Sequence, residues 1–308
     1  MIILFCNDPL NEKAVDIDYE NEYLTAKKLG FSVALISLED LFSGNVRKAI
    51  RLVESIGSLE VALYRGWMMK PPYYELLYKG LLEKNIKLIN SPEEYVACHY
   101  FPNSYKIIKN HTPRSFWLDI NNVRESEILN ILNDFEDKAI IIKDYVKSRK
   151  HEWEDACYIP DVSNKTNAKR IIENFINRQG EDLSGGLVFR EFIPLKKIAV
   201  HPISGMPLAK EYRIFFLHNK LLHNFEYWDE AIYDTEDQPN LDEFIDLARG
   251  INSTFFTMDI AKTEHDKWCV IEVGDGQVSG LPDKVDLEMF YMSIKDFDGE
   301  FGEGRSIS

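Results

Sequence analysis

The stretch from Phe255 to Pro282, FFTMDIAKTEHDKWCVIEVGDGQVSGLP, constrains the fold more than any other part of the chain. Two apolar runs flank the polar segment TEHDK, and a glycine-rich segment follows them. This pattern predicts a β-hairpin followed by a loop. Each run contains one acidic residue, Asp259 in the first and Glu272 in the second. An acid inside an apolar strand is costly unless it is paired or binds a cation.

The register of this hairpin decides whether the two acids meet. A two-residue turn at Glu264-His265 places Asp259 opposite Val270, with Glu272 one diagonal step away on the same face. Diagonal neighbours lie roughly 7–8 Å apart, a gap that suits one or two divalent ions. A turn longer by one residue would put the two acids on opposite faces.

Asp275 adds a third carboxylate just past the second strand, between glycines that let the backbone approach a ligand. Three acids around one hairpin predict a Mg²⁺ site, because Mg²⁺ prefers oxygen ligands. From the hairpin alone, the alternative is a set of acids that face water or pair with buried arginines.

Length and charge narrow the class of protein. The 308 residues, 45% of them apolar, are enough for two or three lobes with a sizeable core. A net charge of −15 disfavours binding to nucleic acid or to anionic membranes. We find no run near the roughly 20 apolar residues of a membrane span, no signal peptide, and no HxH or HxxxH spacing of a zinc enzyme. The cysteines form no CxxC pair and predict free thiols in the cytoplasm: Cys6, Cys98, Cys157 and Cys269.

Strand and helix signals alternate over residues 1–95 and predict a small parallel sheet covered by helices. The predicted strands are Met1–Cys6, Phe31–Ile36, Val61–Arg65 and Lys87–Ile89, and the helices are Tyr19–Leu29, Val46–Ser55 and Tyr73–Lys84. Ligands gather at the carboxyl ends of parallel strands. Arg65 lies at such an end, where it is either a ligand for an anionic group or a charge that caps a loop.

Basic residues follow the predicted strand Lys138–Lys143, KAIIIK. Lys147, Arg149 and Lys150 lie in a loop that can close over polyanions and exclude water. The alternative is a solvated run of charges.

Three further strands are predicted in GLVFREFIPL, EYRIFFLHNK and LLHNFEYW, followed by a helix over Leu241–Arg249. Arg190 lies within the first of these strands, and Glu211 and Arg213 share one face of the second. Charges inside aromatic-rich strands indicate either a functional site or salt bridges. Asp283–Ser308 predicts a short helix with a polar, glycine-rich end.

In order along the chain, IIIKDYVKS, VFREFIPL, EYRIFF, MDIAK and VIEVGDGQ resemble the motifs of the ATP-grasp superfamily. The resemblance covers nearly the whole chain. It is greatest to a divergent clade, marked by arginines and lysines, that includes a eukaryotic cell-division-cycle protein that assists assembly of translation initiation factor 2. It implies an α/β fold, with a pre-ATP-grasp domain over residues 1–95. Two α+β lobes that clasp the nucleotide follow, over 96–182 and over 183–308 with the metal site.

The resemblance also implies ATP and Mg²⁺ as cofactors and assigns site residues. The implied nucleotide contacts are Lys143, Lys106, Lys210 and the hinge backbone of Glu191, Phe192 and Ile193. The implied catalytic residues are Arg190, Arg213 and Lys147. The implied metal ligands are Asp259, Glu272 and Asp275, and the implied substrate contacts are Arg65 and Gln277. Many ATP-grasp enzymes carry an asparagine two residues after the metal glutamate; here that position is Gly274, and Asp275 is its expected substitute.

The implied activity is that of a carboxylate–amine ligase, which forms an amide or peptide bond through an acyl phosphate. Its substrate would be an amino acid, a peptide or a protein side chain. Two alternatives stay open: an ATP-binding assembly factor without ligase turnover, and a kinase on the same fold, which would release a stable phosphorylated product.

Overall fold

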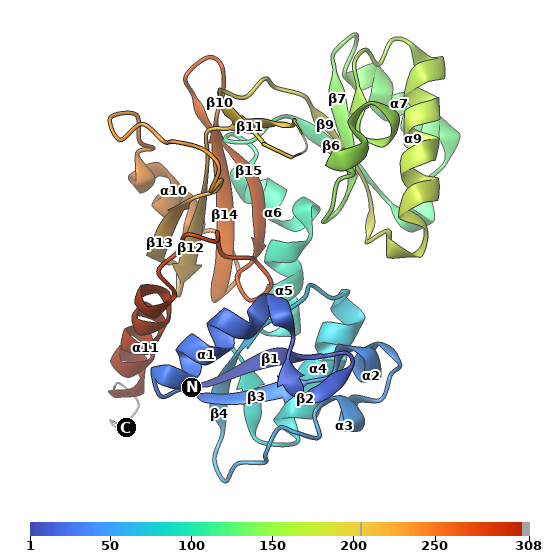
Figure 1. Ribbon diagram of the computed structural model, residues 1–308. Helices are drawn as coiled ribbons and strands as arrows, with labels where there is room; N and C mark the ends of the chain where they lie inside the picture. Colours follow the sequence, from blue (N-terminus) through green and yellow to red (C-terminus); the bar gives the residue numbers. More distant parts are fainter. Residues whose placement is uncertain (204, 304–308) are drawn as a thin grey trace.

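The computed structural model of the protein describes residues 1–203 and 205–303. The large sheets of this part of the chain form three bodies (Figure 1): an N-terminal domain and two lobes above it. The chain is α/β with α+β lobes, as the sequence predicts. The predicted polar end at 304–308 lies outside the described residues.

The N-terminal sheet is parallel except at one edge. Strand β1 (Ile2–Asp8) pairs in parallel with β3 (Ser32–Ile36) and β4 (Glu60–Arg65), and β4 pairs with β5 (Ile86–Leu88). Strand β2 (Asn11–Val15), which no sequence pattern predicts, adds an antiparallel edge. The helices of this domain are α1 (Glu20–Lys28), α2 (Leu38–Phe42), α3 (Val46–Ala49) and α4 (Pro71–Leu82).

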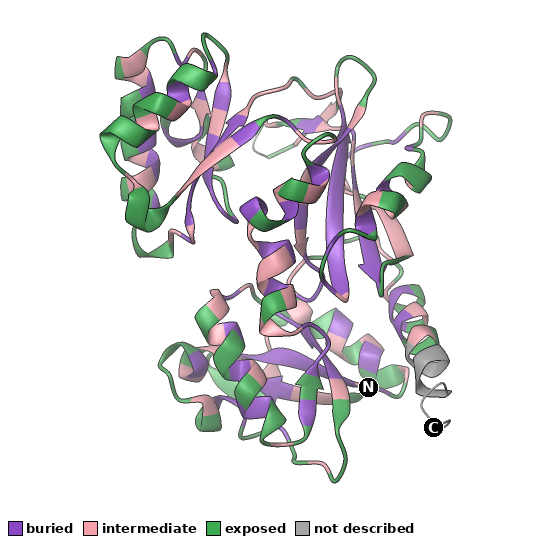
Figure 2. Ribbon diagram, turned by 180° about the vertical axis from the view of Figure 1, so that it is seen from behind, coloured by how far each residue is buried: buried purple, intermediate pink, exposed green. Residues whose placement is uncertain are grey.

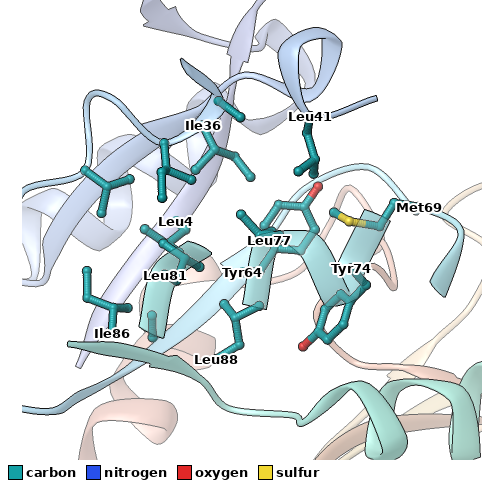
Figure 3. Packing of buried hydrophobic residues seen from close by; sticks show 14 of the residues in the cluster. Leu4, Ile36, Leu41, Tyr64, Met69, Tyr74, Leu77, Leu81, Ile86 and Leu88 are labelled. Atoms are coloured by element: carbon teal, nitrogen blue, oxygen red, sulfur yellow. The ribbon is translucent and has the colours of Figure 1, made fainter. Parts of the chain in front are cut away.

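The helix predicted over Val46–Ser55 stops at Ala49. The Ala49 carbonyl accepts a hydrogen bond from the Ser37 amide at 2.9 Å, so it is not available for another turn of helix. Figure 3 shows the core beneath these elements, where Leu4, Tyr64 and Leu77 are fully buried. This packing explains why the apolar runs of the sequence predict the strands of this domain.

The first lobe is an antiparallel sheet in the order β6-β9-β7-β8. Its strands are β6 (Ser115–Asp119), β7 (Ile140–Asp144), β8 (Tyr158–Ile159) and β9 (Gly186–Glu191). Helices α7 (Glu125–Asp134) and α9 (Lys165–Gln179) pack on one face (Figure 1), and the short α8 (Trp153–Ala156) precedes β8. Because β9 pairs with β6 and β7, the predicted boundary at 182/183 is wrong by sheet membership. Residues up to 191 belong with the first lobe.

The second lobe is an antiparallel sheet in the order β13-β12-β14-β15. Its strands are β12 (Glu211–Leu217), β13 (Lys220–Glu226), β14 (Phe255–Lys262) and β15 (Trp268–Asp275). Every residue of β14 is buried, and Figure 2 shows it at the centre of the lobe. A separate hairpin, β10 (Lys197–Val200) and β11 (Pro207–Ala209), lies between the lobes in sequence and has no counterpart among the predicted strands.

Four helices pack on or follow the second lobe. Helix α10 (Leu241–Ala248) packs into the lobe core together with residues of α5 (Pro92–His99) and α6 (Phe101–Ile108). The segment after residue 95 therefore packs on both lobes, although the sequence assigns it to the first alone. Helix α11 (Leu287–Glu303) is longer than predicted and lies beside α1 of the N-terminal domain (Figure 1).

The four cysteines are buried and free. Within the described residues, every helix is too short or too polar to cross a lipid bilayer. The cytoplasmic location stays a prediction.

Candidate nucleotide and metal site

Asp259 and Glu272 lie directly opposite each other on β14 and β15, and not on a diagonal as predicted. Two irregularities combine to give this register. The turn is longer than two residues, because the Thr263 amide donates to the Lys267 carbonyl at 2.8 Å. A β-bulge at Ile271 then adds one residue to β15 and restores the pairing of the two acids on one face.

Arg190 of the first lobe holds this bulge. Its Nη1 donates to the Ile271 carbonyl at 2.5 Å, and its Nη2 donates to the Val270 carbonyl at 2.9 Å and to Thr112 Oγ1 at 2.8 Å. Both terminal nitrogens are thus used within the protein. The direct catalytic contact predicted for Arg190 does not fit this arrangement, because the guanidinium instead fixes the backbone that presents Glu272.

Arg213 pairs with Asp259 through two hydrogen bonds, from Nε at 2.8 Å and from Nη2 at 2.7 Å. Its Nη1 also donates to the Gly280 carbonyl at 2.9 Å, and its guanidinium lies over the Tyr227 ring. Burial raises the pKa of Asp259 and outweighs the opposing effect of Arg213. This acid is therefore costly to bury as an anion even beside Arg213.

Lys143 of β7 reaches across from the first lobe to Glu272. Its side chain is buried, and Nζ donates to Glu272 Oε1 at 2.7 Å. Burial acts to raise the pKa of Glu272, but the charge of Lys143 and its hydrogen bond lower it on balance. The two lobes thus meet at a pair of opposite charges.

Glu211 is a third acid at this site, and it is absent from the site residues assigned from the sequence. It lies two residues before Arg213 on β12, so both side chains share a face. Burial raises the pKa of Glu211 to about 8, and the charge of Asp259 adds to the shift. The spacing to Arg213 is the available signal in the sequence.

An open pocket of about 230 Å³ adjoins these charges. Asp259, Glu272 and Arg213 line one side, and the remaining lining includes Met68, His99, Val146, Thr257, Ser279 and Gly280. His99 is stacked between Tyr95 and Tyr100, and burial lowers its pKa to about 4, so it faces the pocket uncharged at pH 7. No sequence pattern signals His99 or Met68, because they reach the pocket only through tertiary packing.

Asp275 also lines this pocket, but its carboxyl is bonded on the other side of β15 from Glu272. It is fully buried, where Oδ2 accepts from Asn90 Nδ2 at 2.5 Å and Oδ1 accepts from the Gln277 amide at 2.9 Å. Burial raises its pKa to about 7. Among the described residues no group of three His, Cys, Asp or Glu side chains could hold a metal. Strand alternation directs the Asp275 side chain to the face opposite Glu272, so the predicted role of Asp275 as a third metal ligand does not fit this arrangement.

The two predicted substrate contacts are also buried in the protein. Arg65 is 0% exposed, and its Nε and Nη2 pair with Glu22 at 2.8 and 2.9 Å. Gln277 donates to Tyr74 Oη at 2.8 Å and accepts from the Tyr64 amide at 3.3 Å. Neither side chain can bind a substrate in this arrangement, because each is already enclosed and bonded.

The lysines predicted to bind the nucleotide differ in position. Lys210 is 2% exposed and pairs with Asp237 at 3.0 Å, together with Lys196 and Lys262. Lys210 immediately precedes β12 and is enclosed in this cluster, so its predicted contact with ATP does not fit this arrangement. Lys106 is exposed on α6, and its predicted contact stays untested.

The hinge after β9 is bonded to the first lobe. The amides of Glu191 and Phe192 donate to the carbonyls of Arg114 at 2.8 Å and Ala139 at 2.9 Å. The Phe192 ring packs on Tyr158 and Trp153. An adenine contact by the backbone of Glu191, Phe192 and Ile193 stays a prediction.

The basic loop after β7 touches both lobes. Lys147 is exposed, and its amide donates to Asp144 Oδ1 at 2.5 Å. Arg149 pairs with Glu152 inside the first lobe. Lys150 Nζ lies 5.6 Å from the centre of the Trp228 ring in the second lobe. The loop therefore spans the gap between the lobes beside the pocket.

Two α+β lobes that face each other across a pocket, with a buried lysine on one and paired carboxylates on the other, define a protein of the ATP-grasp fold. A family model of the ATP-grasp domain, that of family 3 in the clade marked by arginines and lysines, matches residues 133–294, and the chain belongs to this family. No curated protein sequence matches the chain. The narrower resemblance to the relatives of the initiation-factor assembly protein stays a prediction.

Solved structures support the same fold over nearly the whole chain. D-alanine–D-alanine ligase from Bacillus anthracis superposes with a TM-score of 0.57 at 14% identity, covering 99% of both chains. D-cycloserine synthetase DcsG gives 0.56 at 10% identity, covering 96% of this chain and 99% of its own. ATP-grasp ligase PsnB in complex with a precursor peptide gives 0.54 at 10% identity and covers 96% of both chains. At such identities the likeness shows the fold alone.

Proposed function

We propose that the protein is an ATP-dependent carboxylate–amine ligase that uses Mg²⁺ and forms an amide or peptide bond. The observation that carries this proposal is the meeting of Lys143 with Glu272, and of Arg213 with Asp259, at the edge of one open pocket. A lysine from one lobe faces paired acids from the other, so polyphosphate and cation can bind side by side.

The carboxylates at the pocket fit Mg²⁺. Asp259 and Glu272 present oxygen donors from opposed positions on adjacent strands. Glu211 lies near these two acids, and burial together with the charge of Asp259 raises its pKa to about 8. When bound, Mg²⁺ supplies charge neutralisation for a transferring phosphoryl group. Asp259 and Glu272 would hold it, and Lys143 would turn from Glu272 to a phosphate oxygen.

The proposed reaction has two steps. The substrate carboxylate oxygen attacks the γ-phosphorus, the bond to the β-phosphate oxygen breaks, and ADP leaves with formation of an acyl phosphate. A neutral amine nitrogen then attacks the acyl carbon, the acyl–phosphate bond breaks, and an amide, inorganic phosphate and a proton are released. Lys143 would align and neutralise the phosphoryl oxygens, because this chemistry depends on positioning and charge. Arg213, whose donors are bonded to Asp259 and to the Gly280 carbonyl, would hold Asp259 in place.

The pocket suits the acid substrate. Met68 and Val146 offer apolar contact, the Thr257 and Ser279 hydroxyls offer hydrogen bonds, and the uncharged His99 does not repel the cationic amine of an amino acid. Lys147 and Lys150 lie in a loop beside this pocket. Closure of the loop would exclude water and so protect the acyl phosphate from hydrolysis.

Release of ADP and phosphate tests the proposal. Purified protein is incubated with MgATP and a panel of amino acids, dipeptides and longer peptides, each alone and in acid–amine pairs. A ligase releases ADP and phosphate in equal amounts only when both partners are present, and mass spectrometry finds the amide. A phosphorylated product without phosphate release would indicate a kinase. ATP binding without turnover on any pair would favour an assembly factor.

A further inference from the structure

The backbone at residues 276–280 forms part of the pocket wall and is held by two arginines from opposite sides. Ser279 and Gly280 line the pocket, and Gly280 accepts from Arg213, which also holds Asp259. On the other side, Arg65 Nη1 donates to the carbonyls of Gly276 at 2.8 Å, Gln277 at 3.2 Å and Ser279 at 2.9 Å. This loop is therefore fixed between the second lobe and the N-terminal domain.

Arg65 donates hydrogen bonds to two sets of partners, Glu22 and the loop carbonyls. Nε and Nη2 pair with Glu22, which also accepts from Tyr291 Oη at 2.7 Å, while Nη1 serves the loop carbonyls. A guanidinium can do both at once because its donors are spread around a rigid plane. A lysine ammonium can reach one of these partners but cannot reproduce the fork.

The loop has other hydrogen bonds, but they do not use the three carbonyls that Arg65 holds. The Gly276 amide donates to the Phe255 carbonyl at 3.1 Å, the Gln277 side chain bonds to Tyr74 and to the Tyr64 amide, and the amides of Val278 and Ser279 donate to the Asp275 carbonyl at 3.2 and 3.1 Å. Ser279 Oγ also lies 2.8 Å from Thr257 Oγ1 and donates to the Asp275 carbonyl at 2.8 Å. The three outward carbonyls rely on Arg65, since buried carbonyls without donors are costly.

We infer that Arg65 is a positioning residue: it holds loop 276–280 against the pocket, so that the N-terminal domain sets the geometry of the acid-substrate site. This inference rests on the proposed function, because that function identifies the pocket as the site of the acid substrate. The clamp on the loop itself is independent of that function. Arg65 does not touch the substrate in this scheme and acts through Ser279 and Gly280.

Two substitutions separate the clamp from the ion pair. Arg65→Lys keeps a cation beside Glu22 and loses the hydrogen bonds to the loop. Glu22→Gln loses the charge pair and keeps the guanidinium on the loop carbonyls. Hydrogen exchange of the amides at 276–280 is measured in both, with the amides of β14 as an internal reference. The KM for the acid substrate and the affinity for MgATP are measured alongside.

In Arg65→Lys we expect the loop amides to exchange roughly tenfold faster while those of β14 are unchanged. The KM for the acid should rise roughly tenfold and the affinity for ATP should stay within about twofold. In Glu22→Gln the thermal midpoint should fall, but loop exchange and KM should stay near the wild-type values.

Unchanged loop exchange in Arg65→Lys, or equal loosening of the loop in Glu22→Gln, would overturn the inference. If Arg65→Lys does not fold, the double variant Arg65→Gln with Glu22→Gln is used, because it removes both buried charges. We expect its loop amides to exchange faster in the same way. Loop amides that stay protected in the double variant would also overturn the inference. Absence of turnover in the wild type would refute the proposed ligase, whereas the exchange measurement would still decide the clamp.

Discussion

Lys143 and Glu272 are 129 residues apart in sequence and belong to different sheets, yet Nζ of the lysine lies 2.7 Å from Oε1 of the glutamate. In a nucleotide complex the lysine would bind a phosphate oxygen and the carboxylate would bind Mg²⁺. In this structure the two side chains bind each other. The pair keeps both charges compensated without ligands. Under the proposed function, nucleotide and metal would therefore compete with this internal contact.

Glu272→Gln should strongly reduce metal-dependent turnover. The amide keeps the size of the side chain but removes the charge that Mg²⁺ prefers, so kcat should fall on the order of a hundredfold. Glu288→Gln, at an exposed glutamate on α11 that pairs with Lys28, is the matched control. Normal turnover of Glu272→Gln at the usual magnesium concentration would mean that the ion is held elsewhere.

Asp275 should make stability fall as pH rises. Burial raises the pKa of its carboxyl to about 7, so the folded state binds this proton more tightly than the unfolded state, whose pKa is near the ordinary value of 3.8. The contribution is full below about pH 4 and is lost as pH rises to about 7, and it amounts to about 4 kcal/mol at most. Urea denaturation of wild type and Asp275→Asn at about pH 5 and about pH 8 measures it. Equal pH dependence in both proteins would contradict the shift.

Lys210→Met should leave the affinity for ATP within about twofold of wild type, because this side chain is buried and paired with Asp237. Asp237 keeps Lys196 and Lys262 as partners, so the loss of stability should be only about 1–2 kcal/mol. Calorimetric titration and thermal denaturation check the two parts. A large loss of ATP affinity in a folded Lys210→Met protein would restore the contact predicted from the sequence.

The fold can be predicted well from the sequence because its signals are local. Apolar runs such as Ile2–Phe5 and the acids of the central hairpin are visible as patterns, and the order of motifs matches the ATP-grasp family. Lys143 and Asp259 both lie beside Glu272, as their assignment to one site predicts, and their roles at that site stay predictions.

The predictions that differ from the structure depend on tertiary contacts, which no local sequence pattern reveals. The bulge at Ile271 depends on Arg190 from another lobe, and it sets the pairing of the acids. Arg65 is predicted to be a ligand contact because it ends a parallel strand, but the loop after β15 fills the place where a ligand would lie. His99 becomes part of the site only through packing of α5 on the second lobe.

The proposed nucleotide site is tested most directly by calorimetric titration of MgATP into wild type and Lys143→Ala. Removing this charge-assisted contact should cost roughly 1.5–3 kcal/mol, which is about a tenfold to more than a hundredfold loss of affinity. Lys169→Ala, at an exposed lysine that pairs with Glu125, should bind like wild type. Equal affinity of wild type and a folded Lys143→Ala protein would contradict the assignment of ATP to the pocket between the lobes.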